Sequence, residues 1–217
     1  VLLPDGRVFC VPSSSTSARI YSPSTDTLST PTGVYPGSGG LCGGALLPDG
    51  RVFCGPLSST SARIYDPSTD TTSTPAGTYS GTNAHSGPCL MSDGRVFLTP
   101  YSSTAAQIYD PVTNTLSTPT GTYPGSLGLF GGRLLPDGRI FFTPYQAASP
   151  RIYDPSTDTL STPSWSSQGG QANFGSVLMR DGRLFIVPAT AASARIYDGG
   201  YPSQPDARVL SAYDNKL

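Results

Sequence analysis

The chain has 217 residues, enough for a sizeable core, and a net charge of −1 with only 12% charged residues. It has no basic stripe, so nucleic-acid binding has little electrostatic support, and no apolar run reaches the roughly 18 residues of a membrane span. The 25 glycines, the 22 prolines and the absence of Glu disfavour long helices and favour strands and turns.

One unit recurs five times along the chain at a step of 44 residues. An Asp-Gly dipeptide begins at residues 5, 49, 93, 137 and 181, and an Ile-Tyr pair begins at residues 20, 64, 108, 152 and 196. A fixed period of this size indicates a repeat architecture. We therefore expect a single domain over residues 1–217. Its units lie at approximately 1–44, 45–88, 89–132, 133–176 and 177–217.

The second unit shows how each repeat is built. We predict short strands at residues 45–47, 51–54, 62–65 and 71–74, separated by turns rich in Pro, Gly, Asp and Ser. The first two strands are apolar on both faces and the last is polar, which is typical of a wedge-shaped sheet packed between two neighbours. The sequence thus predicts an all-β fold, a five-bladed β-propeller whose blades are four-stranded antiparallel meanders. An open solenoid is the less favoured alternative.

The fifth unit departs from the repeat after Asp198. Residues 207–211 are predicted to form a delayed outer strand that ends the ring. In a rival interpretation, residues 207–212 pair near the first blade as a closing strand. In a third, the chain is a piece of a longer propeller.

The cysteines and the repeated charges are assigned structural roles. Cys10 and Cys54 occupy equivalent positions and are expected to be buried free thiols, whereas a bridge between Cys42 and Cys89 stays open. No CxxC spacing occurs, so we expect no metal site. Aspartates of the turn between the third and fourth strands, such as Asp70, are expected to cap turns rather than to bind calcium. The arginine that follows each Asp-Gly is expected to form a structural ion pair or to cover a blade edge.

The units resemble kelch-like propellers of the bacterial kind, whose blades read roughly LLPDGRV…IYDPxTxT. Residues 46–52 and 64–71 carry that pattern. The Gly-Gly pair usual in kelch repeats is replaced, as at Gly55-Pro56, and the usual Trp after the Asp-Pro turn is absent. Propellers of the galactose-oxidase type hold copper with two histidines, two tyrosines and a cross-linked cysteine. With His85 as the one histidine, the resemblance implies no copper site, and we expect no cofactor.

Variation between units is concentrated before the first strand of each blade. Units one and two differ at six of 33 positions over residues 1–33, but at eight of 11 over residues 34–44. In a propeller these segments meet at the mouth of the central channel, where aromatic faces and amides suit recognition. The candidate ligand-binding residues are Asn83, His85, Tyr101, Phe130, Tyr145, Gln171 and Asn173. The competing explanation is that exposed loops simply tolerate change.

Nothing in the sequence assembles a known catalytic site. A Ser-His-Asp triad would have only His85, no G-x-S-x-G turn is present, and the repeated aspartates single out no carboxylate pair. We therefore expect a non-enzymatic protein-interaction or structural module with a protein partner, and a lectin that binds a glycan as the alternative. The compartment stays open, with an extracellular or virion-surface location favoured.

Overall fold

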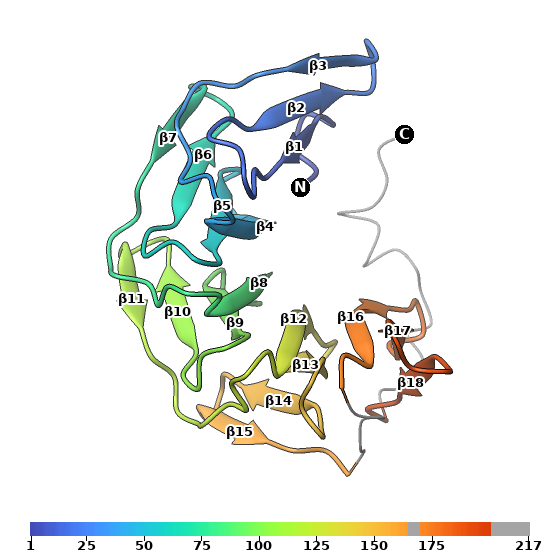
Figure 1. The fold of residues 1–217 in the computed structure, drawn as a ribbon. Coiled ribbons are helices and arrows are strands. Elements are labelled where there is room, and N and C mark those ends of the chain that lie inside the picture. Colours follow the sequence, from blue (N-terminus) through green and yellow to red (C-terminus); the bar gives the residue numbers. More distant parts are fainter. Residues whose placement is uncertain (165–169, 201–217) are drawn as a thin grey trace.

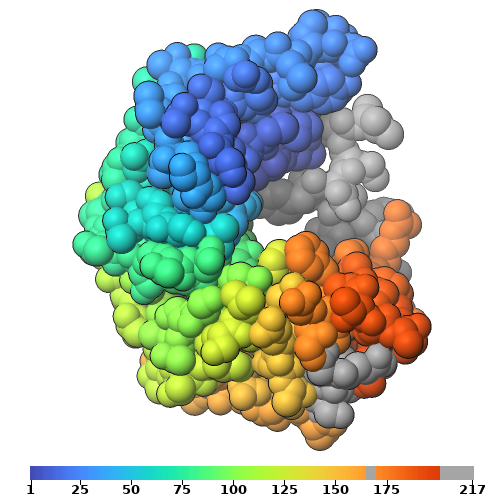
Figure 2. Space-filling model, viewed as in Figure 1, coloured from blue at the N-terminus to red at the C-terminus, as the bar shows by residue number. Residues whose placement is uncertain are grey.

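The computed structural model describes residues 1–164 and 170–200, and in this part the chain is all-β. Five antiparallel sheets lie side by side along an arc, with β4, β8, β12 and β16 on its inner side (Figure 1). The space-filling view places the first sheet, in blue, and the last sheet, in orange, at the two ends of this arc (Figure 2).

The three central sheets have four strands each, in sequential order, and the two end sheets have three. The first sheet is β1 (Val8–Cys10), β2 (Arg19–Ser22) and β3 (Thr27–Ser29). The second is β4 (Leu41–Leu46), β5 (Val52–Pro56), β6 (Arg63–Asp66) and β7 (Thr71–Ser73). The third is β8 (His85–Leu90), β9 (Val96–Pro100), β10 (Gln107–Asp110) and β11 (Thr115–Ser117). The fourth is β12 (Leu129–Leu134), β13 (Ile140–Pro144), β14 (Arg151–Asp154) and β15 (Thr159–Ser161). The fifth is β16 (Asn173–Leu178), β17 (Leu184–Pro188) and β18 (Arg195–Tyr197).

The all-β prediction is confirmed, but the inner strand of each blade begins earlier than predicted. In the second unit it starts at Leu41 rather than at residue 45. The extra residues form a bulge: Leu41 pairs with Pro56 and Gly44 with Cys54, so that the two residues between them have no partner. The segment 207–212, assigned to an outer or closing strand, lies outside the described residues.

Adjacent sheets are joined by four apolar clusters, one at each junction between neighbours. In each cluster, the phenylalanine in the second strand of one blade packs on the tyrosine in the third strand of the next. The ring centroids are 4.7 Å apart for Phe9 and Tyr65, 5.1 Å for Phe53 and Tyr109, 5.0 Å for Phe97 and Tyr153, and 4.8 Å for Phe141 and Tyr197. The core therefore lies between blades.

A second, polar connection runs along the outer edge of the arc. The Tyr65 hydroxyl donates to Asp70 Oδ1 at 3.0 Å, and Asp70 also accepts from the backbone N–H and the hydroxyl of Thr32, which belongs to the preceding unit. Asp70 itself has a φ of 51°, a left-handed conformation that Asp tolerates. This aspartate thus ties neighbouring units together, which the turn-capping interpretation did not foresee.

The repeated Asp-Gly-Arg turns form the expected ion pairs. In every unit the arginine contacts the aspartate two residues before it, at 2.6–2.7 Å. Both side chains are about one third to one half exposed. Exposed pairs of this kind contribute little stability, on the order of 0–1 kcal/mol, so their role is to shape the turn.

All four cysteines are free, so Cys42 and Cys89 form no bridge. Cys54 is buried as expected, but Cys10 is exposed and that part of the prediction is wrong. Cys10 lies in the first sheet, on a face that no other described sheet covers. Among the described residues, no helix is long and apolar enough to cross a membrane.

Replacing Phe97 with Ala should strongly destabilise the protein. The side chain is fully buried and contacts Tyr123, Phe142 and Tyr153. We expect a loss of about 3–5 kcal/mol in the free energy of unfolding, measured by urea denaturation. Val112→Ala, at a side chain that is 91% exposed, is the matched control and should be nearly neutral. A neutral Phe97→Ala would contradict the inter-blade core.

Replacing Asp158 with Asn should weaken the acid sensitivity of stability. Hydrogen bonds from Thr120 hold the pKa of Asp158 below its usual value, and Tyr153 donates to the same carboxylate. A carboxylate whose pKa is lower in the folded state than in the unfolded state stabilises the protein at neutral pH. This stabilisation is lost as pH falls through the folded pKa. The variant should be less stable than the parent at pH 7. The difference between their free energies of unfolding should disappear below about pH 4.

Denaturation curves at pH 7 and pH 3 measure this gap. The third unit already carries Asn114 at the equivalent position, where it accepts from Tyr109 and from the Ala76 N–H, so the amide fits the fold. The control is Asp26→Asn, because Asp26 accepts only from Tyr21 among the described residues. A gap of equal size at both pH values would argue against the assignment.

Candidate functional site

A chain of backbone hydrogen bonds crosses from blade to blade where the inner strands begin. The Tyr101 N–H donates to the Ala84 carbonyl at 2.7 Å, and the Tyr101 carbonyl accepts from Gly128 at 2.9 Å. The Tyr145 N–H donates in turn to the Gly128 carbonyl, and the Tyr145 carbonyl accepts from Ala172. Both tyrosines follow the second strand of their blades, so this chain of bonds places them beside each other, close to where the inner strands begin.

Four aromatic side chains meet there, and we call Tyr101, Phe130, Tyr145 and Phe174 the aromatic cluster. Phe130 stacks on Phe174 with ring centroids 4.0 Å apart. Tyr101 lies 5.8 Å from Phe130 and 6.0 Å from Tyr145, and Tyr145 lies 6.0 Å from Phe174. These separations are typical of favourable aromatic pairs. Three sequence-predicted residues, Tyr101, Phe130 and Tyr145, are thus brought together.

The bulge in the inner strand explains how two phenylalanines come to lie in this cluster. In β12, Phe130 and Gly131 stand between the pairs Leu129–Pro144 and Gly132–Phe142 and have no partner of their own. Gly131 has a φ of 73°, a conformation that glycine adopts readily. A bulge redirects the side chain of its extra residue. Here it directs Phe130 toward the equivalent Phe174 in β16, the inner strand of the next sheet.

The cluster presents an apolar surface together with hydroxyl groups. The Phe174 side chain is 53% exposed, whereas the other three rings are half-buried. Partial burial, and secondarily the neighbouring Tyr145, raises the pKa of Tyr101. Its phenol is therefore protonated at neutral pH and can donate a proton or a hydrogen bond to a bound molecule. Among the described residues, no group of His, Cys and Asp could hold a metal ion.

Two of the sequence-predicted residues are placed inside the fold rather than at its surface. His85 and Asn173 are the first residues of inner strands, opposite Pro100 and Pro188, and are 0% and 3% exposed. Asn173 donates to the Pro144 carbonyl at 3.0 Å. Neither ring nitrogen of His85 has a hydrogen-bond partner among the described residues, and burial lowers its pKa to about 4. The sequence did not reveal where the inner strand begins, so both residues were expected to lie in the loop before it.

The remaining two predicted residues lie on exposed turns away from the cluster contacts. Asn83 and Gln171 have φ values of 57° and 53°, in the left-handed region. The Asn83 side chain accepts from the Ser58 hydroxyl at 3.0 Å. Both residues help to set the turn that precedes an inner strand, and their side chains are exposed at the rim.

The sequence analysis did not select Phe174, the most exposed ring of the cluster. A signal was present, since Phe174 stands one repeat after Phe130 and both replace the small residues Cys42 and Ser86 of the earlier units. Trp165, the one tryptophan of the chain, lies outside the described residues.

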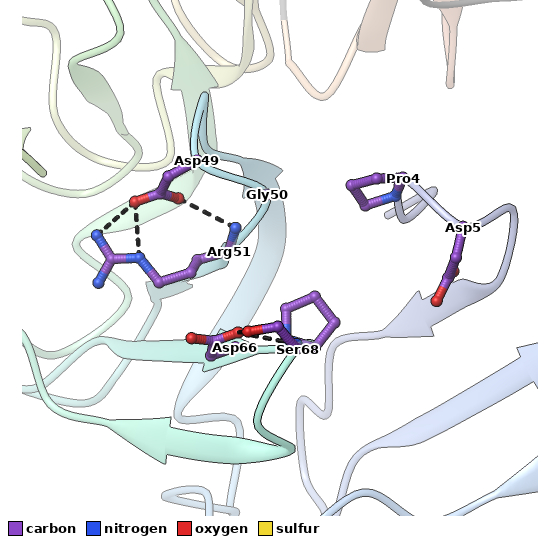
Figure 3. A pocket seen from close by; sticks show the side chains of 8 residues that line it. Pro4, Asp5, Asp49, Gly50, Arg51, Asp66 and Ser68 are labelled. Carbon is purple, nitrogen blue, oxygen red and sulfur yellow. Dashed lines mark hydrogen bonds and ion pairs between the residues drawn. The ribbon is translucent and has the colours of Figure 1, made fainter.

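A separate groove lies at the other end of the strands, between the first and second sheets (Figure 3). Its carboxylates already have partners. Asp49 accepts from Arg51, and Asp66 accepts from the N–H and the hydroxyl of Ser68 at 2.8 and 2.6 Å. Because these bonds satisfy the turns themselves, the groove is a weaker candidate than the aromatic cluster.

Three solved lyase structures have a fold similar to that of this chain. Virginiamycin B lyase from Staphylococcus aureus, a β-propeller, is 12% identical, with a TM-score of 0.73 over 94% of this chain and 70% of its own. A catalytically inactive histidine-to-alanine variant of that lyase with quinupristin gives a TM-score of 0.73 at 12% identity, over 94% of this chain and 69% of its own. A streptogramin B lyase gives the same identity and TM-score, over 91% of this chain and 66% of its own. No protein-family model and no curated protein sequence matches the chain.

These comparisons show the propeller fold and contradict part of the sequence analysis. The expectation of a non-enzymatic interaction module, with a lectin as alternative, is contradicted, because the three solved propellers reported above are lyases. The absence of a familiar triad was a poor reason to exclude catalysis. The kelch family specifically is not confirmed.

Replacing His85 with Leu should remove a pH dependence of stability. A buried His with a pKa of about 4, against 6.5 when unfolded, disfavours the folded state increasingly as pH falls through that interval. The slope is up to about 1.4 kcal/mol per pH unit. Equivalent positions already carry Leu41 and Leu129, so the variant should fold. Urea denaturation from pH 7 to pH 4.5 measures how the free energy of unfolding depends on pH. If this dependence is the same for parent and variant, the burial of a neutral imidazole is contradicted.

Proposed function

We propose that this protein is an enzymatic propeller that binds a ring-bearing small molecule on the aromatic cluster. The observation that carries the proposal is the exposed Phe174 ring, stacked at 4.0 Å on Phe130 and flanked by two tyrosines. An exposed stack of this kind offers apolar area and oriented ring faces to a flat or cyclic ligand.

The reaction class we propose is that of a lyase. Support for the class comes from the fold shared with virginiamycin B lyase and streptogramin B lyase, and this support is an analogy between folds. The cluster adds a binding argument. Burial raises the pKa of Tyr101, so its phenol keeps its proton at neutral pH and can donate a hydrogen bond to a polar group of the ligand at the edge of the cluster.

The cluster is asymmetric, and this favours one site over several equal ones. The position occupied by Phe130 and Phe174 is Cys42 in the second blade and Ser86 in the third. Cys42 Sγ and Ser86 Oγ instead contact backbone carbonyls of the following inner strand, at 3.3 Å in both cases. Only the blades from the third to the fifth therefore contribute rings to the proposed site.

The test uses quinupristin, the compound present with one of the solved lyases. We expect the protein to bind it in isothermal titration calorimetry and to convert it to a product that mass spectrometry detects. Phe174→Ala and Tyr145→Ala should each weaken binding by about tenfold or more, the loss of roughly one aromatic contact worth 0.5–1.5 kcal/mol plus its buried area. Val112→Ala, on an exposed turn of the outer edge, is the control and should change nothing.

The outcomes separate the two parts of the proposal. Binding without conversion would keep the cluster as a binding site and overturn the lyase assignment. Conversion that persists unchanged in both aromatic variants would locate the chemistry elsewhere. Neither binding nor conversion of quinupristin, or of a panel of cyclic peptides with aromatic side chains, would overturn the proposal.

A further inference from the structure

Each internal junction between blades uses the same two faces. One blade contributes a face with the phenylalanine of its second strand and the isoleucine of its third, such as Phe53 and Ile64. The next blade contributes a face with apolar residues of its second strand and a tyrosine of its third, such as Leu98 and Tyr109. We call these the Phe face and the Tyr face. Every blade carries both faces, on its opposite sides.

The Phe face of the last blade is exposed. Phe185 is 37% exposed and Ile196 is 52% exposed. Their counterparts in the four earlier units are buried, at 0% for each phenylalanine and 2–3% for each isoleucine. Val177, on the inner strand, is 53% exposed, although its counterparts Ala45 and Cys89 are each 7% exposed.

The Tyr face of the first blade is exposed in the same way. Cys10 is exposed, whereas the residues at its position in the four later units are all fully buried. Leu28 is 68% exposed on the outer strand. Asp26 accepts from Tyr21 but, within the described residues, from no threonine of a preceding unit, unlike Asp70. Within the described residues, this face thus carries the apolar side chains and the aspartate of a junction but contacts no neighbouring blade.

We infer that one or more further blades of this same repeat type dock between the last sheet and the first, so that the complete ring holds more than five blades. The occupant follows from continuity with the four internal junctions. It presents a tyrosine ring to Phe185 and a phenylalanine ring to Tyr21, and a threonine of its outer loop donates to Asp26. The inference does not depend on the proposed lyase activity.

Two further observations support this occupant over closure of the ring by these five blades. The described structure places the first and last sheets at opposite ends of the arc, and none of its apolar clusters joins them (Figures 1 and 2). The lyase propeller that matches 94% of this chain is matched over 70% of its own length, so that propeller contains chain beyond the part that resembles these five sheets.

Cys10 provides a direct measure of whether the Tyr face is covered. It is the exposed thiol, whereas burial raises the pKa of Cys42 and Cys54 to about 12 and of Cys89 to about 11, so these three react slowly. Because the repeat step is 44 residues, one or two copies of residues 89–132 can be inserted after Gly132 without altering either end face.

We expect Cys10 to react freely with a maleimide in the 217-residue chain. In one of the two lengthened chains the reaction should slow by about tenfold or more, because the added blades bring the two end faces together. Phe185→Ala and Phe141→Ala form the matched pair, since they occupy equivalent positions. Phe185→Ala should leave the melting temperature of the 217-residue chain nearly unchanged. In the lengthened chain in which Cys10 is protected, it should lower the melting temperature as much as Phe141→Ala does.

Several results would overturn the inference. If Cys10 is already protected in a monomeric 217-residue chain, and Phe185→Ala is as destabilising there as Phe141→Ala, five blades close by themselves. If protection appears only as dimers form in sedimentation, a second copy is the occupant. If the lengthened chains fold and Cys10 stays reactive in both, further blades do not cover the face. Should the lengthened chains not fold, the Phe185→Ala comparison in the 217-residue chain still decides whether the face is free.

Discussion

The contact between a phenylalanine and the tyrosine of the following sheet turns five small sheets into one molecule. A sheet of three or four short strands buries too little apolar surface to be stable by itself. Phe53 stacks on Tyr109 of the next sheet, while Tyr65 of its own sheet receives Phe9 of the previous one. Since each sheet offers Phe on one side and Tyr on the other, association has a direction. Each added sheet repeats the same step, and the row bends into an arc.

This arrangement separates what must stay constant from what can vary. The residues of the junctions, and the aspartates that accept hydrogen bonds from a neighbouring unit, lie along the middle and outer strands. They are nearly identical in every unit. The inner strands converge on the channel, and there the bulge leaves one side chain per blade outside the sheet pairing, as at Phe130. A substitution at that position changes the mouth of the channel without changing a junction. The same scaffold can therefore present Cys42 in one blade and Phe174 in another.

The regular part of the fold could be predicted from the sequence, because a 44-residue period and alternating turn chemistry are local signals. The strands from Val52 and Arg63 were placed nearly correctly for this reason. The start of the inner strand could not be predicted, since a bulge at Gly43 breaks the alternation that defines a strand. That error turned His85 and Asn173 into candidate ligand contacts, although both are buried. Tyr101 and Tyr145 were placed together because their separation by one repeat depends only on the period. The number of blades in the ring depends on faces such as Phe185 that the repeat pattern leaves unpaired.

The expectation of a non-enzymatic protein, which the lyase comparisons contradict, rested on residues that serve the scaffold. A repeat scaffold has no helix or loop devoted to a catalytic motif, so a search for triads or carboxylate pairs in the repeated part examines residues that hold the blades together. On the proposed function, chemistry takes place at positions that differ between units, where a few side chains of modest reactivity are enough. A protonated phenol at Tyr101, in contact with the Phe130 ring that stacks on the exposed Phe174, is such a set. A large part of the binding energy would come from the rings, so the orientation of the ligand at the cluster would decide which of its bonds lies near the phenol.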